Sequence, residues 1–126
     1  MLKNENVVRE KGFKFAIRIV RLYQHLTNIQ NSNRELILSK QVLRSGTSVG
    51  ANIRESRNAQ TVKDFLTKLY IASKEADETG YWLELLKETG YISEEQFESI
   101  NQDCEEIMKL LASIIKTTKK NNPDLK

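Results

Sequence analysis

The sequence predicts an all-α protein that folds as a single antiparallel, up-down-up-down four-helix bundle. Glycine and proline are scarce, with five glycines and one proline in 126 residues, so the turns that a β-sandwich or barrel needs are missing. Apolar residues recur at helical spacing in four separate segments. The polar stretches between these segments are short, which forces neighbouring helices to run antiparallel. Apolar residues make up 39% of the chain, enough to bury the core of one domain.

The first helix is predicted over about residues 6–29 by an apolar stripe at intervals of four and three: Phe15, Ile19, Leu22, Leu26 and Ile29. The polar residues 31–33 break this pattern. Ser32 followed by Glu35 has the form of a capping box, which predicts that a second helix begins there. The polar run at 56–60 ends the second helix, whose stripe is Leu38, Val42, Ser45, Val49 and Ile53.

The third and fourth helices have clear start and stop signals. Thr61 and Asp64 can cap the third helix, and Gly90 can take the left-handed conformation that ends it. Its stripe keeps the heptad spacing of a left-handed bundle: Phe65, Leu69, Ala72, Ala76, Thr79, Leu83 and Leu86. Ser93 and Gln96 form a second capping box, followed by the stripe Phe97, Ile100, Cys104, Ile107, Leu111 and Ile114. We therefore expect one domain over residues 1–120 and a frayed tail at 121–126.

The second helix contains small and polar residues that a plain bundle does not need. Gly46 and Gly50 each weaken a helix by about 1 kcal/mol, which close approach of another helix would offset. A polar stripe runs beside the apolar one: Gln41, Ser45, Ser48, Asn52 and Glu55. The third helix offers it Glu75, Glu78 and Trp82 on one face, with Arg44 or Arg54 to pair with the carboxylates. We favour a packing surface, within or between subunits, over a ligand site.

The residues that most enzymes need are missing from the sequence. A lone Cys104 and a lone His25 form no zinc cluster, and no Glu-x-x-His motif is present for a di-iron centre. Glu55, Glu75 and Glu78 leave acid–base chemistry as a weaker alternative. We therefore expect no enzyme activity, metal, cofactor or small-molecule substrate. The single cysteine fits a reducing cytoplasm, and neither a signal peptide nor a membrane span is recognisable.

Charge is divided unevenly along the chain. Residues 1–63 carry 12 basic and 4 acidic residues, whereas residues 64–126 carry 8 basic and 13 acidic residues. The first helix has four cations on one narrow stripe: Lys11, Lys14, Arg18 and Arg21. This stripe can bind a phosphate backbone, or it can be an ordinary solvated helix face. A ring of identical subunits would repeat the stripe and strengthen weak phosphate contacts.

Two segments carry a family resemblance. The segment QVLRSGTSVGANIRE at 41–55 and the segment IASKEADETGYWLEL at 71–85 closely resemble a bacterial four-helix-bundle family. Its founding members are encoded in intervening sequences of 23S ribosomal RNA genes. The resemblance implies a homopentamer without established enzymatic activity. It also implies that the motif residues are structural or lie at an interface: Gln41, Arg44, Ser45, Ser48, Asn52, Glu55, Glu75, Glu78, Tyr81 and Trp82.

These observations favour one function and leave others open. The favoured hypothesis is a non-enzymatic, ring-like homo-oligomer that binds RNA, such as ribosomal RNA, through Lys11, Lys14, Arg18 and Arg21. One alternative is a protein-interaction scaffold whose basic helices dock on the acidic helices of neighbouring copies. A related branch of the family resembles the accessory protein of diversity-generating retroelements, which associates with reverse transcriptase and nucleic acid. That likeness adds a retroelement-type role as a further alternative.

Overall fold

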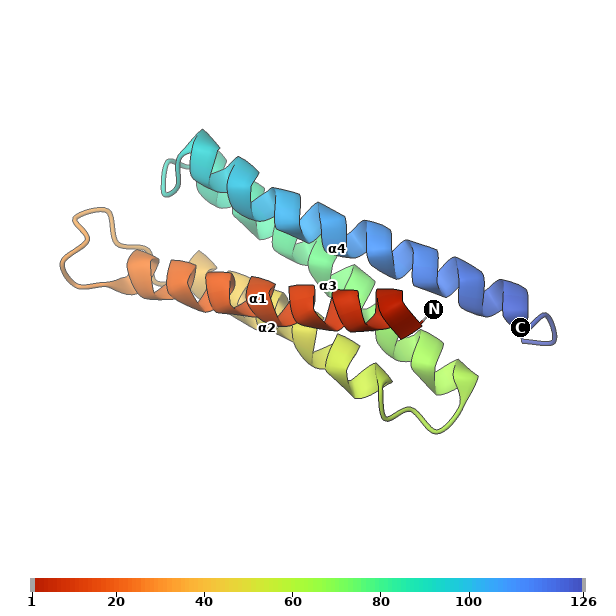
Figure 1. The fold of residues 1–126 in the computed structure, drawn as a ribbon. Coiled ribbons are helices and arrows are strands. Elements are labelled where there is room, and N and C mark those ends of the chain that lie inside the picture. Colours follow the sequence, from red (N-terminus) through yellow and green to blue (C-terminus); the bar gives the residue numbers. More distant parts are fainter. Residues whose placement is uncertain (1, 126) are drawn as a thin grey trace.

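The computed structural model describes residues 2–125, and these residues form four helices in the order α1 (Leu2–Thr27), α2 (Leu38–Ser56), α3 (Val62–Glu88) and α4 (Glu94–Asn121). The helices run alternately up and down (Figure 1), so the predicted all-α, up-down-up-down bundle is confirmed. None of the helices within residues 2–125 is both long and apolar enough to cross a bilayer.

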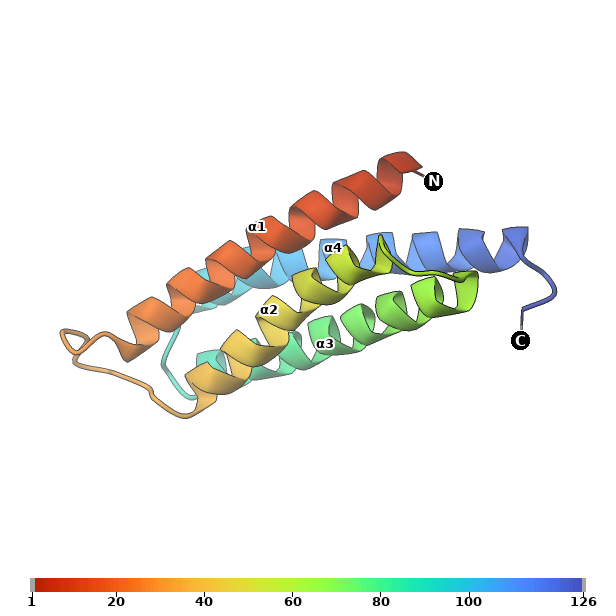
Figure 2. The same ribbon diagram turned by 90° about the horizontal axis from the view of Figure 1, so that it is seen from below.

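The four helices stand at the corners of a square. Within residues 2–125, α1 packs against α2, α2 against α3, and α3 against α4, and α4 also packs against α1. The pairs α1/α3 and α2/α4 therefore lie on the diagonals. Figure 2 shows the four helices from a second side. The bundle accordingly has one face made of α1 and α2 and an opposite face made of α3 and α4.

The predicted stripes form the core between the helices. Phe15, Ile19 and Leu26 of α1 are at most 1% exposed, as are Val42 and Val49 of α2. The same holds in α3 and α4 for Leu69, Ala72, Ala76, Leu83, Leu86, Cys104, Ile107, Leu111 and Ile114. Two polar members of the stripes, Ser45 and Thr79, are buried as well. The helical spacing read from the sequence therefore identified the core faces correctly.

The caps of α3 and α4 form as predicted. The Thr61 hydroxyl accepts a hydrogen bond from the Asp64 backbone N–H at 3.0 Å. Ser93 and Gln96 make the reciprocal bonds of a capping box, at 2.8 and 3.1 Å. Gly90 has a φ of 86°, the left-handed conformation that favours glycine after a helix.

The start of α2 differs from the prediction. No Ser32 cap forms, because α2 begins at Leu38 and the buried Glu35 carboxylate accepts hydrogen bonds from three N–H groups at this end of the helix. Ile29 does not join the core either, since α1 ends at Thr27 and the Ile29 side chain is 81% exposed. Side-chain bonds hold the α1–α2 connection, among them Asn33 Nδ2 to the Gly90 carbonyl at 3.0 Å.

The glycines of α2 pack against α1. A Cβ atom added at Gly50 would lie 2.8 Å from the Gly12 carbonyl oxygen, and one at Gly46 would lie 2.7 Å from Ile19 Cγ1. Real Cβ atoms do not approach neighbours this closely, so both positions require glycine at the observed helix separation. The prediction that small residues of the second helix admit another helix is confirmed, and the helix admitted is α1.

Candidate functional site

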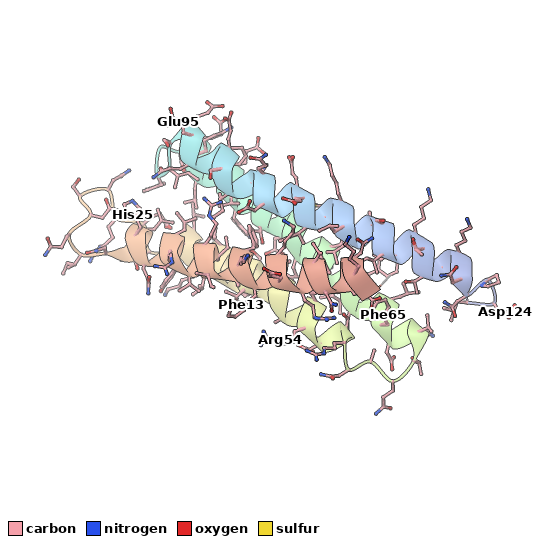
Figure 3. The ribbon with its side chains drawn as sticks, viewed as in Figure 1. Phe13, His25, Arg54, Phe65, Glu95 and Asp124 are labelled. Atoms are coloured by element: carbon pink, nitrogen blue, oxygen red, sulfur yellow. The ribbon has the colours of Figure 1, made fainter. Side chains whose placement is uncertain are left out.

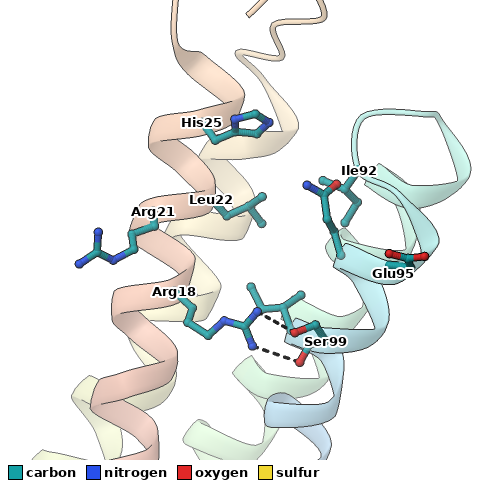
Figure 4. Close-up of a pocket in the computed structure, with 9 residues that line it drawn as sticks. Arg18, Arg21, Leu22, His25, Ile92, Glu95 and Ser99 are labelled. Carbon is teal, nitrogen blue, oxygen red and sulfur yellow. Dashed lines mark hydrogen bonds between the residues drawn. The ribbon is translucent and has the colours of Figure 1, made fainter.

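Two residues of the basic stripe of α1 lie at the seam between α1 and α4. Lys11 Nζ is 2.8 Å from a carboxylate oxygen of Glu106, and Arg18 Nη1 is 2.7 Å from Asp103 Oδ2. Arg18 also donates to the backbone and hydroxyl oxygens of Ser99, at 3.1 and 2.9 Å (Figure 4). Two of the four cations are thus bonded to acidic or polar groups of α4.

The other two cations of the stripe are more accessible. Lys14 is paired within α1, with its Nζ 2.8 Å from a carboxylate oxygen of Glu10, and both side chains are more than 60% exposed. This pairing lowers the pKa of the Glu10 carboxyl below its ordinary value. Arg21 is exposed, makes no ion pair within residues 2–125, and points away from α4 in Figure 4. The Lys14 and Arg21 side chains are therefore the most available to an external anion.

A groove opens beside Arg18, where α1 passes the start of α4. Its volume is about 450 Å³, and apolar side chains of Leu22, Ile92 and Ile100 form part of its lining (Figure 4). His25 and Glu95 lie at its margin. His25 is an exposed residue near the end of α1. The seam between α1 and α4 is therefore bridged by polar contacts and is only partly filled.

The polar stripe of α2 meets α3. The Thr79 hydroxyl of α3 lies 2.9 Å from Ser45 Oγ of α2, and both side chains are fully buried. Within α3 the Thr79 hydroxyl also lies 2.7 Å from the Glu75 carbonyl oxygen, one turn earlier. Arg44 pairs with Glu78 and lies 3.4 Å from Glu75. The expected pairing of an arginine with these two carboxylates is confirmed for Arg44. Arg54 instead lies over the Phe13 ring, 5.4 Å from its centroid (Figure 3).

Glu78 is the centre of this contact. The indole N–H of Trp82 donates to a Glu78 carboxylate oxygen at 3.0 Å. This hydrogen bond and, after it, the Arg44 guanidinium lower the pKa of Glu78, because both favour the ionised carboxylate. The carboxylate is thus bound on two sides by groups of its own chain, an arrangement typical of a structural network.

The remaining motif residues make contacts elsewhere or are exposed. Asn52 Nδ2 donates to the backbone and hydroxyl oxygens of Ser48, at 2.9 and 3.0 Å, so these two residues bond within α2. Glu55 pairs with Lys68 of α3 at 2.8 Å. Gln41 is exposed, and Tyr81 is 59% exposed with its ring edge-on to Trp82. The polar stripe therefore joins α2 to α3 over part of its length.

Metal-ligating clusters and the single cysteine bear on the chemistry that the described residues allow. Within residues 2–125, no three His, Cys, Asp or Glu side chains are placed to hold a metal ion. Cys104 is buried, donates from Sγ to the Ala76 carbonyl at 3.1 Å, and has its pKa raised by burial to about 12. A thiol with such a pKa is a poor nucleophile at neutral pH.

An apolar surface that was not predicted from the sequence lies on the outer side of α1. Phe13, Ile17 and Val20 are 54%, 38% and 37% exposed, and we call these three residues the outer face of α1. Cavities of about 320 and 340 Å³ lie on either side of Phe13. The signal was present, since these residues follow intervals of four and three, but the core stripe of the same helix concealed it.

These features define a class of protein: an antiparallel four-helix bundle whose motif residues tie its own helices together. The family model for the 23S rRNA-intervening sequence protein matches residues 4–113, and the chain belongs to this family. The chain is also similar to a crystal structure of a protein of unknown function from the S23 ribosomal protein family of Bacteroides thetaiotaomicron. The two share 60% sequence identity over 90% of this chain and 98% of the other, with a TM-score of 0.85. No match was found among curated proteins.

Proposed function

We propose that the chain is a non-enzymatic bundle protein that assembles with copies of itself into a ring-like oligomer and binds RNA. The observation that carries this proposal is the outward surface of α1, where exposed cations lie beside three exposed large apolar side chains. A helix that only closed its own bundle would be polar on its outer side. The α1 surface has properties of both a protein contact and a phosphate contact.

Assembly is supported by the outer face of α1. Phe13, Ile17 and Val20 form a continuous apolar strip, and such strips mark protein contacts more often than isolated exposed residues do. The family resemblance implies five subunits. The heptad spacing of α3 supports a left-handed twist of the helices within each subunit.

RNA binding is supported by the cations of α1, which the structure divides into two groups. Lys14 and Arg21 reach solvent and would make the primary phosphate contacts. Lys11 and Arg18 are held by α4 carboxylates, but both pairs are partly open to water, which screens them, so phosphates can replace the carboxylates. An oligomer would repeat these contacts and raise the effective concentration of cations along one RNA.

An RNA titration at several salt concentrations tests this proposal. The native chain should bind a folded ribosomal RNA fragment, with an affinity that falls steeply as salt rises. The double variant Lys14→Glu/Arg21→Glu should lose most of this binding while its circular dichroism spectrum stays helical. The matched control Lys116→Glu/Lys120→Glu changes the charge equally at exposed positions of α4 and should retain more binding. Equal losses in the two double variants would contradict a role for α1 in particular.

A protein-interaction scaffold is the second candidate function. It includes the case of a retroelement-type accessory protein that partners a reverse transcriptase. The specific observation in its favour is that Glu106 and Asp103 already neutralise Lys11 and Arg18. If the native chain binds no RNA even at low salt, the stripe serves to hold α1 on α4. The oligomer would then act by binding other proteins and not RNA.

A further inference from the structure

The outer face of α1 has basic side chains around it. Arg54 lies over the Phe13 ring, and Arg9 lines the same cavity of about 320 Å³ beside that ring. Within residues 2–125, neither arginine forms an ion pair. The α1/α2 side of the bundle therefore presents an apolar knob, Phe13, with two arginines that have no carboxylate partner.

The opposite side of the bundle has a groove of complementary character. Between α3 and α4 lies a cavity of about 370 Å³. Its lining includes three carboxylates, Asp77, Glu84 and Glu105, none of which forms an ion pair within residues 2–125. Gly80 leaves space there, because a Cβ atom added to it would meet a single atom, Asn101 Oδ1, at 3.5 Å. The exposed Tyr81 ring stands beside this space.

We propose that copies of the chain join head to tail, with Phe13 of one copy inserted over Gly80 in the α3–α4 groove of the next. This inference rests on the proposed self-assembly and names the two surfaces that meet. The Phe13 ring would pack against the aromatic side chain of Tyr81. Arg9 and Arg54 would meet the carboxylates of the groove, which supply the partners that both sets of charges lack.

Charge also argues against pairing of like faces. A two-fold contact between two α1/α2 faces would bring arginines against arginines, and a contact between two grooves would bring carboxylates together. The knob and the groove lie on opposite sides of the square of helices, so one copy can engage two neighbours at once. Repetition of such a contact produces a closed ring or an open chain, depending on the angle between copies.

Two variants, each lacking one of the surfaces, test the proposal by sedimentation velocity. Phe13→Glu removes the knob at a position that is 54% exposed, and Gly80→Leu fills the groove where a Cβ atom has room. Each variant alone should be monomeric at concentrations where the native chain is assembled. A 1:1 mixture should form heterodimers and nothing larger, because each variant retains the surface that the other needs.

The matched control is Ile29→Glu, which places the same charge at an apolar side chain that is 81% exposed and outside both surfaces. This variant should assemble as the native chain does. If circular dichroism shows that Phe13→Glu or Gly80→Leu does not fold, the charge reversals Arg54→Glu and Glu84→Lys replace them. Each reversal alone should weaken assembly, and both together in one chain should restore it.

Three results would overturn the proposal, and they separate it from the proposed function. If the mixture of folded single variants stays monomeric, the Phe13 surface and the α3–α4 groove do not bind each other and the proposed head-to-tail contact is wrong. If both variants assemble as the native chain does, or if the paired charge reversals do not restore assembly, other surfaces meet while self-assembly itself stands. If the native chain is monomeric at every concentration, the proposed assembly and this inference fail together.

Discussion

Replacing Gly50 by alanine should destabilise the bundle, although alanine is the better helix former. Gly50 lies inside α2, where a change from glycine to alanine favours the helix by about 1 kcal/mol. The new Cβ atom, however, would lie 2.8 Å from the Gly12 carbonyl oxygen and 3.1 Å from its carbonyl carbon. These are backbone atoms, so no rotamer change relieves the clash and α1 itself must move.

Gly80 provides the matched control for this prediction. It also lies inside a helix, α3, but a Cβ atom there meets its neighbour at 3.5 Å, an ordinary contact. Gly80→Ala should therefore show the helix-propensity gain alone, about 1 kcal/mol of added stability. Overpacking typically costs about 1–3 kcal/mol. Because both variants share the same gain, the difference between their free energies of unfolding should equal this overpacking cost.

Urea denaturation followed by circular dichroism measures that difference. Both variants and the native chain should be unfolded at the same concentrations, over a range wide enough to separate folding from association. We expect Gly50→Ala to be the less stable of the two variants by about 1–3 kcal/mol. Equal stabilisation by the two substitutions would refute the reasoning, because it would mean that α1 and α2 are not in backbone contact at Gly12 and Gly50.

Three further predictions concern single side chains. Glu35→Ala removes the acceptor for three N–H groups at the start of α2 and should lower the free energy of unfolding in urea by about 1–3 kcal/mol. The lowered pKa of Glu78 stabilises the fold above the unfolded-state pKa, and this contribution is lost as pH falls through the folded-state pKa. Trp82→Phe removes the indole N–H, the main cause of the lowered Glu78 pKa. The free energy of unfolding of this variant should therefore fall less between about pH 6 and about pH 3 than that of the native chain. Cys104, with a pKa of about 12, should resist iodoacetamide in the folded protein and react once urea unfolds it; rapid reaction without urea would contradict its burial.

Features that depend on neighbouring residues in the chain were predictable from the sequence. The caps at Thr61 and Ser93 and the left-handed Gly90 involve groups at most a few residues apart, so short motifs identify them. The start of α2 was predicted wrongly although its capping is also local, because Ser32 and Glu35 have the form of a capping box while the Glu35 carboxylate in fact accepts from the N–H groups of residues 37–39. Its connection to α1 is fixed in part by Asn33, whose side chain bonds to a carbonyl 57 residues away, and no local pattern reveals such a contact.

The candidate site also has features that the sequence predicts and features that it does not. The pairing of Arg44 with Glu75 and Glu78 followed from helix faces that the sequence defines. The pairing of Lys11 with Glu106 did not, because it depends on which side of α1 faces α4 in the folded bundle. The exposure of Phe13 was likewise hidden, since α1 has two apolar stripes and periodicity does not say which of them is covered.

The backbone contact between Gly12 and Gly50 also fixes the position of α1 along α2. If α1 slid along α2 by one helical turn, Val8 or Ala16 would occupy the place of Gly12, and their side chains would strike the Gly50 backbone. The position of α1 along its own axis is thereby set. Lys11 adjoins this point and meets α4 at Glu106. Gly12 and Gly50, which have no side chains, thus determine which charged residues of α1 and α4 face each other on another side of α1.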